Sequence, residues 1–227
     1  MLLDRERKNI VEYGNRMLSE KLTSGTSGNI SIYDPETGYM AISPSGIPYP
    51  DTAPEDVVIM DLQGTVVDGI RKPSSEYMLH SVFYKNRKDI RAVVHAHSMY
   101  CTTLACIGQP LKAVHYAIAD AGAAALPIAR YETFGTPELA GAVEEVLDGH
   151  IKGMLLANHG MLAAGTDIKE AFSLAMTMEW CAELQWRCMC AGKPNVLTDE
   201  QMAEAIKRYQ SYGQTTGNTA RSVKGYF

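Results

Sequence analysis

The chain has 227 residues, 46% of them hydrophobic, and a formal net charge of −5 at pH 7. This length fits one domain with its own core, and the acidic balance argues against a nucleic-acid partner, whose phosphates attract basic surfaces. No apolar run reaches the roughly 18 residues of a membrane span, and the charged N-terminus does not resemble a signal peptide. Five cysteines, an odd number, favour a reduced, cytoplasmic setting.

The N-terminal half begins with apolar residues at helical spacing from Asp4 to Lys21, with Asp4 as the expected N-cap. Two pairs of short apolar runs follow, and each pair flanks a polar turn, so the pattern predicts two consecutive β-hairpins. The four runs span 30–33, 39–42, 57–60 and 65–67. Consecutive hairpins indicate a largely antiparallel sheet. Neither a G-x-G-x-x-G turn after a strand nor a Walker-type loop occurs, which argues against a nucleotide cofactor.

The rest of the chain alternates apolar strand-like runs with helical patterns. Strands are predicted over 92–95, 127–130, 154–157 and 160–164, and helices over 74–86, 99–107, 136–149, 167–191 and 198–212. His80 falls on the apolar face of its helix and is expected to be structural. The fold class predicted is α/β, a single domain with a central, mainly antiparallel β-sheet flanked by helices on both faces. The polar residues 214–227 are expected to form a tail outside this domain.

Three histidines lie where apolar, strand-like runs end. His95 and His97 are two residues apart, so an extended strand places both imidazoles on the same side, while His159 follows the run 154–157. Glu76 comes after a polar turn upstream. Three imidazoles and one carboxylate would form a tetrahedral shell for a zinc-like ion. The alternative is that each histidine is a hydrogen-bonded residue at a sheet edge, and the spacing alone does not decide between the two.

Three polar, glycine- or serine-containing stretches offer groups that bind anions: backbone N–H groups, hydroxyls, a side-chain amide and a helix N-terminus. The residues are Gly28, Asn29, Ser45, Gly46, Ser74 and Ser75. Any one stretch could equally be an ordinary turn or helix cap, because these residue types dominate turns.

An ordered series of motifs resembles that of the class II (metal-dependent) sugar-phosphate aldolases, over nearly the whole chain to about Gly213. The motifs are Gly25-Thr26-Ser27-Gly28-Asn29, Ser43-Pro44-Ser45-Gly46-Ile47-Pro48-Tyr49, Pro73-Ser74-Ser75-Glu76, His95-Ala96-His97, His115-Tyr116, Thr133-Phe134-Gly135-Thr136 and Asn158-His159-Gly160. Single motifs are not decisive, but their order is specific. The resemblance implies a class II aldolase domain over residues 1–213 and a tail, 214–227, that is flexible or closes over the active site.

The same resemblance implies the site and its chemistry. One Zn²⁺ per subunit would be held by His95, His97 and His159, with Glu76 as fourth ligand and catalytic acid–base group. The three anion-binding stretches would hold the substrate phosphate. Tyr116 and Tyr212 would handle the aldehyde-side oxygen. The implied assembly is a homotetramer with active sites at subunit interfaces, acting on small phosphorylated ketoses and aldehydes.

The motifs most resemble those of family members that cleave L-fuculose 1-phosphate to dihydroxyacetone phosphate and L-lactaldehyde. The alternative is L-ribulose-5-phosphate 4-epimerase, because Asn158-His159-Gly160 is the more epimerase-like form of that triplet. A third possibility is a non-catalytic interaction domain, but such relatives have lost the metal ligands, and this chain keeps them.

Overall fold

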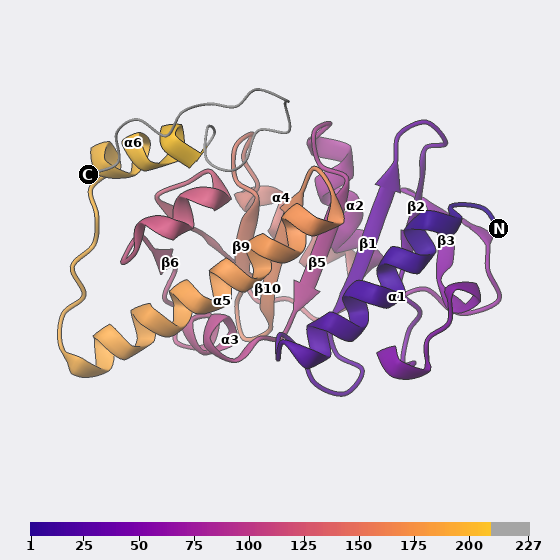
Figure 1. Cartoon of the computed structure of the whole chain (residues 1–227), viewed down its shortest axis with the longest axis horizontal. Coiled ribbons are helices and arrows are strands. Elements are labelled where there is room, and N and C mark those ends of the chain that lie inside the picture. The colour runs from indigo at the N-terminus through magenta and orange to yellow at the C-terminus, as the bar shows by residue number, and fades with distance from the viewer. Residues whose placement is uncertain (210–227) are drawn as a thin grey trace, which may run out of the picture.

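A twisted eight-stranded sheet runs through the protein in the computed structural model, which describes residues 1–209 (Figure 1). Its strand order is β4-β3-β2-β1-β5-β10-β9-β8. The strands are β1 Asn29–Asp34, β2 Tyr39–Ile42, β3 Val58–Asp61, β4 Val66–Asp68, β5 Ala92–Ala96, β8 Ile128–Ala129, β9 Gly153–Leu156 and β10 Gly160–Gly165. Only β8 and β9 pair in parallel, so the predicted, mainly antiparallel sheet is confirmed. The predictions for the tail 214–227 and for Tyr212 lie outside the described residues.

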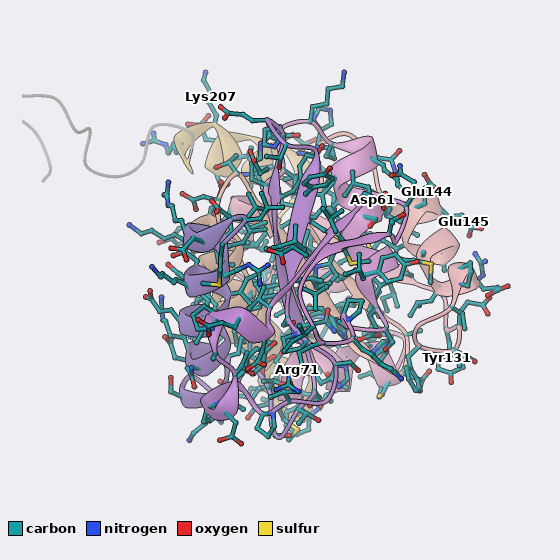
Figure 2. The ribbon with its side chains drawn as sticks, turned by 90° about the vertical axis from the view of Figure 1, so that its right-hand side faces the viewer. Asp61, Arg71, Tyr131, Glu144, Glu145 and Lys207 are labelled. Carbon is teal, nitrogen blue, oxygen red and sulfur yellow. The ribbon has the colours of Figure 1, made fainter. Side chains whose placement is uncertain are left out.

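Helices cover both faces of this sheet, as predicted. One face carries α1 Asp4–Ser19, α3 Met99–Cys106, α5 Ile168–Ala191 and α6 Asp199–Tyr209, and the other carries α2 Tyr77–Asn86 and α4 Pro137–Val146. In Figure 1, α1 and α5 cross the near face of the sheet. Figure 2, turned by 90°, shows α4 on the opposite side from α1, with Glu144 and Glu145 pointing outward.

The strands alternate between two hydrophobic cores because successive side chains point to opposite faces. In β5, Ala92, Val94 and Ala96 pack under α1, α3 and α5, whereas Val93 packs under α2 and α4. All four side chains are fully buried. The strand that ends at the histidine pair is therefore held from both sides.

Several boundaries differ from the predictions by up to three residues, and two of these differences, both at helix starts, have a clear local cause. The helix expected from Asp4 is capped by Leu3, whose φ of 52° is left-handed, so Asp4 as N-cap is wrong; it is the first helical residue. The helix expected from residue 74 begins at Tyr77, because Ser74 to Glu76 form a tight turn in which the Glu76 N–H donates to Ser74 Oγ at 3.3 Å. That turn places Glu76 at the helix N-terminus.

Two short strands, β6 Leu111–Lys112 and β7 Ala125–Leu126, form a separate ribbon with the 3₁₀ helix η3 Tyr116–Ala121 between them. Within residues 1–209, no helix combines the length and the apolar character that crossing a membrane requires.

Candidate metal centre

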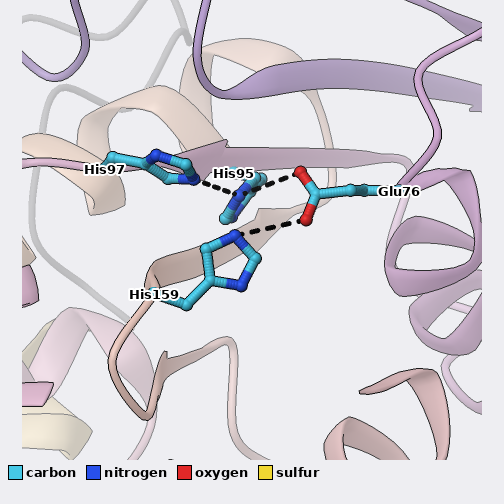
Figure 3. A group of neighbouring side chains, drawn as sticks. All are labelled: Glu76, His95, His97 and His159. Atoms are coloured by element: carbon cyan, nitrogen blue, oxygen red, sulfur yellow. Dashed lines mark hydrogen bonds and ion pairs between the residues drawn. The ribbon is translucent and has the colours of Figure 1, made fainter. Parts of the chain in front are cut away.

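Four side chains from three separate parts of the fold meet at one end of the sheet (Figure 3). Glu76 precedes α2, His95 and His97 lie at the end of β5, and His159 lies in the turn between β9 and β10. Their ligand atoms all lie within 4.8 Å of one another. The convergence predicted from the sequence is present in the structure.

Strand pairing brings His159 to the histidine pair. β10 lies antiparallel to β5, with Leu162 opposite His95 and Met161 opposite Ala96. The tight β9–β10 connection then places His159 just beyond the end of β5. Asn158, before it, has a left-handed φ of 54°, a conformation that asparagine tolerates better than most residues.

Hydrogen bonding orients His95. Its Nδ1 lies 2.9 Å from the backbone oxygen of Met161, which can only accept, so Nδ1 carries the proton and Nε2 faces the centre. That Nε2 lies 3.0 Å from His97 Nε2 and 3.3 Å from Glu76 Oε2. The remaining carboxylate oxygen, Oε1, lies 3.2 Å from His159 Nε2. Figure 3 shows these nitrogens and oxygens facing one another.

The protonation states suit metal binding, which requires deprotonated ligands. Burial by itself would raise the pKa of Glu76, but the neighbouring imidazoles of His95 and His159 outweigh burial and hold that pKa well below its usual range. Desolvation of its ring and the proximity of His95 and His159 lower the pKa of His97 to about 4.

The residues present fit a divalent metal ion. Among the described residues, Glu76 Oε1 is one of the few buried polar side-chain atoms without a hydrogen bond of normal geometry, although it lies 3.2 Å from His159 Nε2. A shared cation would satisfy this oxygen and the converging Nε2 atoms together. Three imidazoles with one carboxylate is a donor set typical of zinc and similar ions.

A cavity of about 310 Å³ opens beside the centre. It is lined by Glu76, His97, Tyr131, Glu132, Phe134, Asn158 and His159. Sequence reasoning missed Tyr131 and Glu132; their only signal was their position next to the Thr133-Phe134 motif.

The three stretches expected to bind phosphate are brought side by side. The Ser45 N–H donates to Lys72 O at 2.9 Å, and the Ser74 N–H donates to Ser43 O at 3.0 Å. The Ser43 N–H in turn donates to Ile30 O at 3.0 Å. This ladder joins the segments that carry Asn29, Ser45 and Ser74 directly beside Glu76.

Within these stretches the individual residues differ in exposure. Ser45, Gly46 and Ser75 are exposed, whereas Ser74 is buried. Gly28 has φ +77°, and a Cβ there would lie 2.7 Å from the backbone oxygen of His95, so only glycine fits. Asn29 is buried, and its Nδ2 donates to Glu76 Oε2 at 3.0 Å.

Tyr116 does not line the cavity of its own chain. It begins η3, is 56% exposed, and its ring lies 4.5 Å from that of His115. At the other end of η3, Ala121 O accepts from the Lys152 N–H, just before β9. That position is at the opposite end of β9 from His159.

The fold and the cluster of three histidines and a glutamate can now be compared with those of known proteins. Residues 8–186 match the class II aldolase and adducin N-terminal domain, and the chain belongs to this family. It is a class II aldolase, as its motifs predicted.

Individual relatives are similar to this chain over most of its length. The chain is 48% identical over 214 residues to 5-deoxy-D-ribulose 1-phosphate aldolase of Bacillus thuringiensis serovar kurstaki, covering 94% of this chain and 100% of the relative. It is 36% identical over 193 residues to L-fuculose phosphate aldolase of Escherichia coli (strain K12), covering 85% and 88%. A solved structure of L-fuculose 1-phosphate aldolase has a TM-score of 0.88 and 40% identity, covering 91% and 96%.

Proposed function

We propose that this protein uses one zinc ion per subunit to cleave a deoxyketose 1-phosphate into dihydroxyacetone phosphate and a short aldehyde. The observation that carries the proposal is the convergence of Glu76, His95, His97 and His159 within 4.8 Å. Retention of all four residues argues against a non-catalytic interaction domain.

The substrate we favour is 5-deoxyribulose 1-phosphate, which would yield acetaldehyde as the second product. The relative named for that substrate is 48% identical over 94% of this chain, whereas the E. coli relative named for L-fuculose phosphate is 36% identical over 85%. L-Fuculose 1-phosphate, the substrate that the motifs suggested, is the second candidate. Both molecules carry the phosphate on C1 and end in a methyl group, so they present the same reacting atoms.

The chemistry follows from where the side chains lie. An ion held by His95, His97 and His159 would act as a Lewis acid and polarise the substrate carbonyl. Breaking the C3–C4 bond leaves its electron pair on C3. We assign to Glu76 the delivery of a proton to that carbon, a proton that its carboxylate would first take up from solvent. The proton of the C4 hydroxyl leaves as the aldehyde carbonyl forms, so protons balance overall.

The phosphate would bind on the joined stretches beside Glu76. Ser45, Gly46 and Ser75 are exposed there, and the N-terminus of α2 adds a favourable dipole for an anion. Gly28, Asn29 and Ser74 complete the proposed phosphate site by allowing close backbone approach and by shaping its floor. These assignments rest on the ladder between the three segments.

Tyr116 would relay the C4 hydroxyl proton to solvent by releasing the proton of its own hydroxyl as it takes up the other, and it would do so in a neighbouring subunit. Its position away from its own chain's cavity supports a homotetramer with active sites at subunit interfaces. Tyr212 is proposed for the same side of the substrate. A cytoplasmic location is also proposed, since all five cysteines are free thiols.

The test is a coupled assay of zinc-loaded protein with three substrates: 5-deoxyribulose 1-phosphate, L-fuculose 1-phosphate and L-ribulose 5-phosphate. A reductase that consumes dihydroxyacetone phosphate reports cleavage. We expect the highest kcat/KM with the first substrate. Greater kcat/KM with L-fuculose 1-phosphate would overturn the substrate assignment, and conversion of the third to xylulose 5-phosphate without cleavage of the others would make the protein an epimerase.

A further inference from the structure

A chain of hydrogen bonds leads from Glu76 away from the centre and into the core under α2. Asn29 Nδ2 donates to Glu76 Oε2 at 3.0 Å, and Asn29 Oδ1 lies 2.5 Å from His80 Nε2. His80 Nδ1 lies 2.7 Å from Ser31 Oγ, which lies 2.6 Å from the hydroxyl of Tyr84. His80 and Ser31 are fully buried, and Asn29 and Tyr84 are 5% exposed.

The donor and the acceptor of every hydrogen bond in this chain follow from the Glu76 carboxylate and from the neutral ring of His80. A carboxylate only accepts, so the NH₂ group of Asn29 must face Glu76 and its Oδ1 must face His80. Oδ1 also only accepts, so His80 carries its proton on Nε2. Burial lowers the pKa of His80 to about 3, so the ring is neutral and Nδ1 is an acceptor. Ser31 therefore donates to His80, and Tyr84 donates to Ser31.

This arrangement of donors and acceptors assigns His80 a role beyond the structural one expected from its place on the apolar face of its helix. If the proton of His80 moved to Nδ1, the unprotonated Nε2 would attract the NH₂ group of Asn29. The amide would then turn its oxygen toward the Glu76 carboxylate and repel it. The hydroxyl of Ser31 opposes this change, because it already donates to Nδ1.

We propose that His80 is a positioning residue, which through its Nε2–H and the amide of Asn29 holds the Glu76 carboxylate in place at the metal centre. The inference rests on the proposed function, since it assigns Glu76 its acid–base role. The hydrogen bonds of the His80 ring go to Asn29 and Ser31, neither of which is a proposed metal ligand. Partners that orient metal ligands in this way typically change metal affinity or activity about 10- to 100-fold when they are removed.

Three substitutions separate this role from simple packing. His80→Phe keeps a buried planar ring but removes both hydrogen bonds. Ser31→Ala removes the donor that fixes the proton of His80, and with it the acceptor of the Tyr84 hydroxyl, but leaves the His80 ring in place. Tyr84→Phe is the matched control, because it also deletes a buried hydroxyl of the chain, keeps the ring stacked on Tyr33 at 5.0 Å, and leaves Ser31 free to donate.

The experiment measures two quantities for each variant: Co²⁺ affinity of the metal-free protein, by competition with a chromophoric chelator, and kcat and KM with 5-deoxyribulose 1-phosphate. We expect His80→Phe to weaken Co²⁺ binding and to lower kcat by about 10-fold or more, with KM within about twofold. Ser31→Ala should show about a fivefold loss, which corresponds to one hydrogen bond. Tyr84→Phe should match the wild type in both, and His80→Gln, whose amide can still donate to Asn29, should recover most of the loss.

Unchanged Co²⁺ affinity and kcat in Ser31→Ala and in a folded His80→Phe would overturn the proposal. So would an equal loss in Tyr84→Phe, because packing alone would then explain all three variants. If His80→Phe fails to fold, Ser31→Ala decides the question. Absence of cleavage by the wild type would refute the proposed function instead, and the Co²⁺ affinities would still test the positioning of Glu76.

Discussion

At the scale of single residues, the centre depends on the backbone and on hydrogen bonds as much as on its ligands. His95 presents Nε2 because the backbone of Met161 takes its other proton, and His159 reaches the centre from a left-handed residue, Asn158. Gly160, the next residue along, cannot carry a side chain, since a Cβ there would lie 2.4 Å from Ala96 O. The ligands are therefore set by neighbours with no metal-binding groups of their own.

Glu76→Gln is expected to lower kcat by about 10²- to 10⁴-fold, because it removes the proposed acid–base group while keeping its shape. The measurement is dihydroxyacetone phosphate release under saturating zinc and substrate. Glu36→Gln, in the exposed β1–β2 turn, is the matched control and should behave as the wild type. A Glu76→Gln variant that retains kcat within a few-fold would show that another group transfers the proton.

Asn158→Val is expected to lower the free energy of unfolding by about 1–3 kcal/mol, because a β-branched residue is strained at positive φ. It should also weaken Co²⁺ binding, since the strain can be relieved by moving His159. Asn158→Gly, which has no such strain, is the control and should retain both properties. Equal effects of the two substitutions, measured by urea unfolding and chelator competition, would mean that the φ of 54° is unimportant.

At the scale of elements, α3 is held to α5 immediately after the histidine pair. Glu179 of α5 accepts from the Tyr100 N–H at 2.8 Å and from the Cys101 N–H at 2.9 Å, so its carboxylate caps α3. The residue that precedes α3, Ser98, makes no such cap with its own side chain. A long-range carboxylate thus replaces the local cap and complements the helix dipole.

Glu179→Ala should lower the free energy of unfolding by about 1.5–3 kcal/mol, because two backbone N–H groups lose a charged acceptor. Glu183→Ala, one turn along the same helix, removes only the surface pair with Arg187 and should cost less than about 1 kcal/mol. Urea unfolding of both variants provides the comparison. A smaller loss in Glu179→Ala than in Glu183→Ala would show that the cap does not stabilise the fold.

Local sequence patterns predicted the helices and strands better than they predicted which of these elements lie next to one another in the fold. The i, i+2 spacing of His95 and His97 predicted that both imidazoles lie on the same side of the strand, and their Nε2 atoms lie 3.0 Å apart. The approach of His159 depends on the pairing of β5 with β10, which no local pattern specifies. The contact between Asn29 and Glu76 joins residues 47 apart in the sequence, so the spacing gave no sign that the amide binds the carboxylate.

At the scale of the whole molecule, the single chain brings together the proposed metal ligands and the stretches proposed to bind phosphate, but it does not bring Tyr116 to the cavity. Sequence motifs predicted that Tyr116 belongs to the site, but its place relative to the other residues follows from how η3 packs against α5 and α6. We therefore expect Tyr116→Phe to lower kcat while leaving Co²⁺ affinity unchanged, because the residue would act on the substrate from another subunit.

The most direct test of the central claim is to remove bound metal with a chelator, titrate Zn²⁺ back, and follow dihydroxyacetone phosphate release from 5-deoxyribulose 1-phosphate. We predict no release without metal, and a rate that rises with zinc and levels off at one equivalent per chain. Release by protein shown to be metal-free by mass spectrometry would contradict a metal-dependent aldolase. Binding of one zinc per chain without release from either ketose 1-phosphate would contradict the assigned reaction.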